Sequence, residues 1–234
     1  MKIEERPLNV VAVFAHPDDE AGILGTLTNH SERGDNVYVV MLTHGENASS
    51  LKGTPEEIAK TREGHVSKIE KIIDGKYILM DIPDSGVTPS IENAKKLATI
   101  FKKLKPDIVI TWGEYKTLGL GHPDHRYTHT ITLDALSYAR YKNNDDEYPP
   151  HREPVSLYTP IEGSGTSDAS IYIDVSKQFD KIMQCFDVYE EAYGQWPVRK
   201  YVVSEMSVNG MFLGVEYAEV FKKVLWRKAC FYLD

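Results

Sequence analysis

Two short clusters of histidine and aspartate carry the groups in this sequence that could do chemistry. They are "AHPDDE" at residues 15–20 and "GHPDH" at residues 121–125, and each lies downstream of an apolar run. Imidazole and carboxylate ligands that leave one coordination position open are typical of catalytic zinc, whereas structural zinc prefers thiolates. His16 and Asp19 could supply two ligands from one turn, and residues 122–125 could supply the third. The clusters therefore predict a divalent metal site that activates water.

The elements that position these clusters are predicted from the apolar pattern. Runs of strand length alternate with segments of helical period, which is typical of a parallel sheet between helices. Strands are expected at 9–15, 36–43, 76–82, 106–113, 155–160 and 169–175, and helices at 20–33, 54–74, 90–105, 124–141 and from about 176. In an open sheet of order 3-2-1-4-5 the ligand crevice lies between strands one and four. The two clusters should then face each other across that crevice.

The fold class that follows is α/β: a Rossmann-like, mostly parallel sheet flanked by helices, in a single domain of residues 1–234. Residues 1–140 are expected to form the metal-binding core, and residues 141–234 a less regular part with substrate loops at 142–168 and a C-terminal helical region. The aromatic stretch at 211–226 has helical spacing, which predicts a core helix rather than an exposed platform for a ligand.

Composition excludes several partners. The formal net charge is −8, which argues against a nucleic-acid binder because such binding depends on Lys and Arg contacts with phosphate. Pro17 and three carboxylates fill the first turn, where a nucleotide-binding turn would need glycines. No apolar run approaches the roughly 20 residues that span a bilayer, so no membrane partner is expected. The two cysteines, Cys185 and Cys230, are expected to be buried thiols, which fits a cytoplasmic protein.

Both motifs resemble those of the LmbE-like (PIG-L) deacetylases, and weaker matches continue in "THGE" (43–46), "TREGH" (61–65), "IPDSG" (82–86) and "YAE" (217–219). The resemblance implies zinc held by His16, Asp19 and His125. It also implies that Asp18 stays off the metal as the general base. His122 is expected beside the metal, where it stabilises the oxyanion or protonates the departing amine.

The resemblance also implies substrate contacts, since family members hold sugar hydroxyls with an Arg and an Asp that match Arg62 and Asp84. The family often carries Glu three residues after that Arg, where this chain has His65. Four further residues are expected near the metal ligands without binding the metal. Glu20 and Glu46 are expected to cap helices or to support the ligands from outside, Asp124 to support them, and His129 to pack in the core or support them. Three other histidines are not expected to be catalytic: His44 at the crevice, and His30 and His151 on the surface.

The function implied is that of a zinc-dependent hydrolase, which removes an N-acetyl group from an N-acetylglucosamine-type sugar or a soluble glycoconjugate by metal-activated water. One alternative is an amidase of a thiol-sugar conjugate, or of another amide, with the same metal centre. The other is a non-catalytic ligand-binding module that contains metal, and this module would have no need of an unligated Asp18. The ligand types also suit Fe(II) or Co(II). The sequence leaves monomer and homo-oligomer both open.

Overall fold

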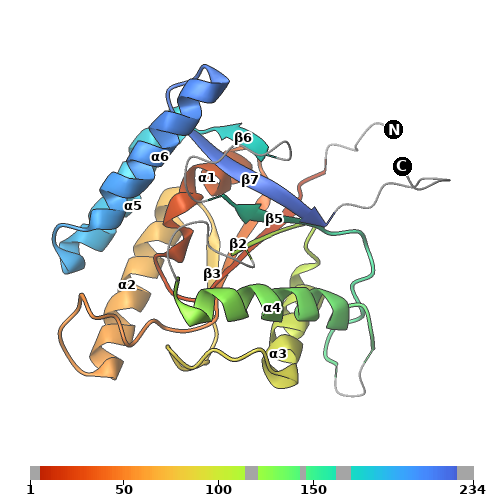
Figure 1. Ribbon diagram of the computed structural model, residues 1–234. Helices are drawn as coiled ribbons and strands as arrows, with labels where there is room; N and C mark the ends of the chain where they lie inside the picture. The colour runs from red at the N-terminus through yellow and green to blue at the C-terminus, as the bar shows by residue number, and fades with distance from the viewer. Residues whose placement is uncertain (1–5, 114–120, 143–145, 162–169, 226–234) are drawn as a thin grey trace.

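A seven-stranded sheet of order β3-β2-β1-β4-β5-β7-β6 runs through the part of the chain that the structure describes (Figure 1). The computed structural model describes residues 6–113, 121–142, 146–161 and 170–225. The strands are β1 Asn9–Phe14, β2 Asn36–Met41, β3 Lys76–Leu79, β4 Ile108–Thr111, β5 Ser156–Pro160, β6 Ser170–Asp174 and β7 Ala218–Leu225. The helices are α1 Leu24–Glu32, α2 Pro55–Ile73, α3 Ile91–Leu104, α4 Pro123–Tyr138, α5 Phe179–Tyr193 and α6 Pro197–Leu213, with short 3-10 helices at Asp19–Gly22 and Ser176–Gln178.

The strand order confirms the expected doubly wound topology. Strands β1 to β5 are parallel in the order 3-2-1-4-5, and β7 pairs antiparallel with both β5 and β6. Val10 of β1 is in register with Ile108 of β4. The carboxyl ends of β1 and β4 are therefore neighbours, and the segments that follow them start from the same edge of the sheet.

The apolar run of β1 is continuous because both of its faces are covered. Val10, Ala12 and Phe14 belong to a core that also contains residues of α1, α2 and α5. Val11 and Val13 point to the other face and pack in a second core with residues of α3 and α4. In Figure 1, α3 and α4 lie together on one side of the sheet, and α1, α2 and α5 lie on the other.

Strand β7 is tied to the start of α1 by a buried carboxylate. Glu219 is 3% exposed and accepts hydrogen bonds from the backbone N–H groups of Gly25 and Thr26, each at 2.8 Å. Gly25 is required there, because a Cβ atom would lie 2.6 Å from the Cβ of Val175. This contact joins the C-terminal strand to the helix that follows the first cluster.

The prediction of one core helix at 211–226 is wrong. Helix α6 ends at Leu213, Gly214 adopts a left-handed conformation with φ 76°, and strand β7 follows. A short apolar run is compatible with both the helical period and the strand period. Here Gly214 ends the helix, and the pairing of the following residues with β5 and β6 makes them a strand. Met211 and Phe212 are also 79% and 61% exposed, so the end of α6 is not core.

Of two minor expectations, the one for His151 is wrong and the one for Cys185 is confirmed. His151 is buried rather than on the surface, because its Nε2 donates to the carbonyl of Pro106 at 2.9 Å. Cys185 is a buried free thiol in α5, as expected. Cys230 and the loop at 162–168 lie outside the described residues. Among the helices that the structure describes, none has the length and apolar character needed to cross a bilayer.

Candidate active site

The loop after β1 folds into a tight turn around one carboxylate. Asp19 Oδ2 accepts hydrogen bonds from the backbone N–H groups of Ala15 at 3.1 Å and His16 at 2.9 Å. The backbone N–H of Asp19 in turn donates to the carbonyl of His16 at 3.1 Å. These bonds fix both side chains at the carboxyl end of β1, with His16 8% exposed.

The second cluster is positioned by the start of α4. His122 is the N-cap of this helix: its Nδ1 accepts the backbone N–H of Asp124 at 3.2 Å, and Pro123 occupies the first helical position. His125 follows in the first turn, and its Nε2 lies 3.1 Å from Asp19 Oδ1. The histidine spacing of "HPDH" thus serves to cap the helix and to direct an imidazole at the first cluster.

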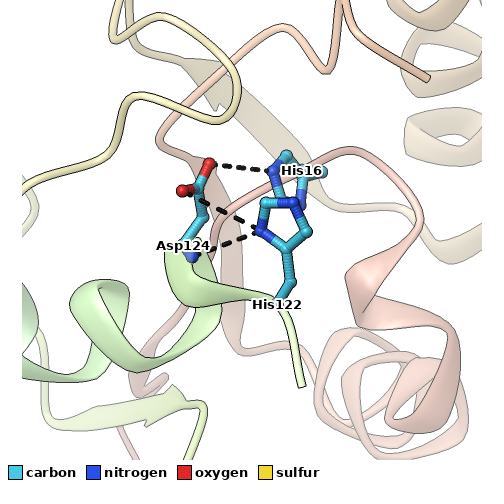
Figure 2. A group of neighbouring side chains, drawn as sticks. All are labelled: His16, His122 and Asp124. Carbon is cyan, nitrogen blue, oxygen red and sulfur yellow. Dashed lines mark hydrogen bonds and ion pairs between the residues drawn. The ribbon is translucent and has the colours of Figure 1, made fainter. Parts of the chain in front are cut away.

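Two overlapping groups of side chains could hold a metal ion. One is His16, Asp19 and His125, and the other is His16, His122 and Asp124; in each group, one potential ligand atom per residue lies within 4.8 Å of the others. Figure 2 draws the second group, in which Asp124 contacts both histidines. With three protein ligands, the first group would leave one position of a tetrahedral ion for water, and it has the donor types of catalytic zinc.

Charge in the first group fits a cation. Burial lowers the pKa of His16, but hydrogen bonds and charge from Asp19 and Asp84 outweigh burial and raise that pKa to about 11. Burial likewise disfavours ionised Asp19, yet His125 and His16 hold its pKa well below the ordinary value. The cluster therefore stabilises positive charge at this point, which a proton or a metal dication can supply. These donors fit zinc.

The far side of His16 is held by two carboxylates. Its Nε2 lies 3.1 Å from Asp84 Oδ1 and 3.3 Å from Asp124 Oδ2, the second of which Figure 2 shows. Burial raises the pKa of Asp84, but His16 and the backbone of Asn47 lower it to about 2 overall. Asp124 also accepts the N–H of Ser85 at 2.8 Å. With a metal bound in place of the Nδ1 proton, a carboxylate at Nε2 would favour the tautomer in which Nδ1 is the ligand atom.

Trp112, which no sequence motif indicated, contacts one residue of each cluster, Asp19 and His125. It directly follows β4, and its ring stacks on His125 with centroids 4.4 Å apart at 14°. Its indole N–H donates to Asp19 Oδ2 at 3.3 Å, and its carbonyl contacts His129 Nδ1 at 2.7 Å. His129 therefore packs behind the cluster instead of joining it. An aromatic residue at a strand end beside the crevice is the only signal that the sequence offers for Trp112.

Asp18 belongs to neither candidate metal group. Its Oδ2 contacts Arg62 Nη2 at 2.9 Å and accepts a hydrogen bond from the Tyr193 hydroxyl at 3.1 Å. Burial raises the pKa of Asp18 to about 7, although Arg62 opposes this rise. The backbone of Asp18 is in the left-handed region with φ 112°, which is rare for a residue other than glycine. Such strained residues are often found at functional sites.

The predicted substrate contacts lie around the same cluster. Arg62 is 4% exposed and donates to the carbonyl of Pro17 as well as to Asp18. Glu46 accepts the backbone N–H of Asp84 at 2.8 Å through Oε1, and its Oε2 is buried without a partner in the described structure. Arg62 and Asp84 stay predicted substrate contacts, and Glu46 adds an unpaired acceptor beside them.

Comparison with known proteins identifies the family. The model of the PIG-L family, described as GlcNAc-PI de-N-acetylase, matches residues 11–136. This chain belongs to the PIG-L family. Every residue of the two candidate metal groups lies within the matched range.

This chain is similar to two proteins that are named as deacetylases and to a solved structure whose title names no activity. A diacetylchitobiose deacetylase of Thermococcus kodakarensis is 25% identical over 220 residues, which cover 90% of this chain and 80% of that protein. A 1D-myo-inositol 2-acetamido-2-deoxy-alpha-D-glucopyranoside deacetylase of Corynebacterium efficiens is 32% identical over 154 residues, 55% of this chain but only 49% of that protein. The conserved protein TT1542 of Thermus thermophilus is 27% identical, with a TM-score of 0.79 over 95% of this chain and 100% of that structure.

Proposed function

We propose that this protein is a zinc-dependent hydrolase that removes the N-acetyl group from an N-acetylglucosamine-type sugar or a soluble glycoconjugate, in the cytoplasm. Family membership and the names of its relatives support N-deacetylation. The observation that carries the proposal is Asp18, a carboxylate adjacent to the His16, Asp19 and His125 group but outside it. A binding module would have no use for such a carboxylate.

In the proposed reaction, His16, Asp19 and His125 would hold the ion. Zinc bound there would supply Lewis acidity, which would lower the pKa of water toward neutrality and polarise the acetamide carbonyl. Asp18 accepts the proton of the attacking water. A pKa near 7 suits a group that must take up a proton and release it near neutral pH.

His122 acts on the leaving group. Because its Nδ1 accepts the backbone N–H of Asp124, its Nε2 is the nitrogen that carries a proton. In this neutral form the N–H can stabilise the charge that develops on the carbonyl oxygen, whereas protonation of the amine requires the imidazolium, which carries a proton on Nδ1 as well. His122 is also the more exposed of the cluster's histidines, with 41% of its side chain accessible, which leaves it open to substrate. The products are acetate and the free amino sugar.

The experiment is amine release from free N-acetylglucosamine, diacetylchitobiose and a thiol-sugar conjugate, with metal analysis of each preparation. Asp18→Asn should keep zinc and lose roughly a thousandfold in kcat, because it removes the base but not a ligand. His125→Ala should lose the metal. Asp134→Asn, an exposed change in α4, is the matched control and should match the wild type.

Each other outcome changes the conclusion. Wild-type rates in Asp18→Asn would rule out the general base. Cleavage of the thiol-sugar conjugate alone would replace the proposed substrate with that of the amidase alternative. A zinc-loaded protein that binds these sugars and hydrolyses none of them would be a binding module.

A further inference from the structure

Two tyrosines of α5 reach the loop that carries the proposed base. Tyr189 and Tyr193 are one helical turn apart, so they share a face of α5, and their rings stack with centroids 6.0 Å apart. The Tyr193 hydroxyl donates to Asp18 Oδ2 at 3.1 Å, and the Tyr189 hydroxyl donates to Glu20 Oε1 at 2.5 Å. Both tyrosines lie outside residues 11–136, which the family model matches.

The backbone of Asp18 is held by Glu20. Glu20 is fully buried and accepts the backbone N–H of Asp18 through Oε2 at 3.0 Å. Its other oxygen accepts the hydroxyls of Tyr77 at 2.8 Å and Tyr189 at 2.5 Å. A buried carboxylate anchored by β3 and α5 thus fixes the left-handed backbone of Asp18. Only rotation of the Asp18 side chain is left for another group to control.

Both contacts to the Asp18 side chain fall on one oxygen. Arg62 and Tyr193 each bind Oδ2, whereas no described residue donates a hydrogen bond to Oδ1. Two donors that approach the same oxygen from different elements define the plane of the carboxylate. Oδ1 is left as the atom that can take a proton from water.

The ring of Tyr193 is itself confined. It packs against Tyr189, Trp196 and His65, with centroids 6.0, 5.7 and 5.6 Å away, and the guanidinium of Arg62 lies over it at 5.8 Å. A rigid ring presents its hydroxyl in one place. Replacement by phenylalanine should therefore remove the hydroxyl and leave the packing intact.

We propose that Tyr193 is a positioning residue, whose hydroxyl, together with Arg62, holds Oδ2 of Asp18 so that Oδ1 faces the attacking water. The inference rests on the proposed function because it takes Asp18 as the base. It assigns to α5 a part in the reaction, although the metal ligands all come from the loop after β1 and from α4.

The test compares Tyr193→Phe with Tyr201→Phe. Tyr201 lies on α6, is 42% exposed and donates its hydroxyl to Glu205, so Tyr201→Phe is a control for loss of a tyrosine hydroxyl elsewhere. In Tyr193→Phe, kcat should fall at least about tenfold, since a hydrogen bond to a charged group is lost. KM and zinc stoichiometry should stay at wild-type values, Tm should fall by only a few degrees because one hydrogen bond is lost, and Tyr201→Phe should be unchanged throughout.

An unchanged or raised kcat in Tyr193→Phe overturns the inference, and so does a raised KM at constant kcat, which would mark Tyr193 as a substrate contact. If the wild type hydrolyses none of the sugars, the proposed function fails, and crystal structures of the zinc-loaded proteins decide the inference separately. We then expect one orientation of the Asp18 carboxylate in the wild type and a rotated or split carboxylate in Tyr193→Phe. The same single orientation in both proteins overturns it.

Discussion

Glu219 makes the stability of this protein depend on pH in a defined window. Burial at the start of α1 raises its pKa to about 7, against an ordinary value of 4.5, although the N–H groups of Gly25 and Thr26 oppose the rise. The folded protein therefore binds this proton more tightly than the unfolded chain does. The contribution to the free energy of unfolding is complete below pH 4.5 and is lost as the pH rises to about 7.

The size of the effect follows from these two pKa values. At about 1.4 kcal/mol for each tenfold change in proton affinity, the shift of Glu219 should lower the free energy of unfolding by about 2–3 kcal/mol between pH 5 and pH 8. Glu219→Gln removes the titration. The difference in unfolding free energy between variant and wild type should therefore move by about 2–3 kcal/mol in favour of the variant over that range.

The assay is urea unfolding of the metal-free proteins at pH 5, 6, 7 and 8. Any constant cost of placing an amide at the start of α1 cancels, because only the change with pH is compared. Glu216→Gln, an exposed change near the start of β7, is the control and should follow the wild type at each pH. Parallel curves for Glu219→Gln and the wild type would refute the reasoning, as would a divergence in the opposite direction.

Three further predictions concern the site and its support. Trp112→Phe keeps an aromatic ring at this position but removes the indole N–H that donates to Asp19, so zinc should bind about tenfold more weakly in a chelator competition. Equal affinity would show that this hydrogen bond is not needed. Gly25→Ala forces a Cβ against Val175 and should cost about 1–3 kcal/mol in urea unfolding, and an unchanged midpoint would contradict the close approach. The pH profile of kcat/KM should be bell-shaped, rising as Asp18 loses its proton at or below about pH 7 because bound zinc favours the carboxylate; a flat profile from pH 5 to 9 would count against an acid–base pair.

The motifs made part of the site predictable. Each histidine and aspartate of the two clusters stands at a strand end or a helix start, and the order 3-2-1-4-5 brings those points together. The positions of these residues could be predicted because strand ends and helix starts have local sequence signals and because the strand order is a common one. The helix predicted at 54–74 is confirmed as α2, which begins with a capping box formed by Thr54 and Glu57.

The support behind the clusters was not predictable. Tyr189 and Tyr193 are one turn apart in an apolar helix, a pattern that normally indicates core residues. Their hydroxyls reach the loop after β1 only because α5 packs beside α2 and that loop. Trp112 likewise reads as the end of a strand. The run that forms β7 was predicted as helix from its spacing, and its pairing with β5 and β6 makes it a strand. Tertiary packing decides each of these cases.

The two halves of the candidate metal site come from distant parts of the chain, since His16 and Asp124 are 108 positions apart. An unfolded chain rarely brings such distant groups together, so an ion at this site would bind the native state and have very low affinity for the unfolded state. By mass action, free metal at about a hundred times its Kd would add about 2.7 kcal/mol to the free energy of unfolding. If the ion is zinc, as proposed, depletion of zinc from a cell should reduce the amount of folded protein as well as its turnover, because more of the chain would be unfolded and degraded.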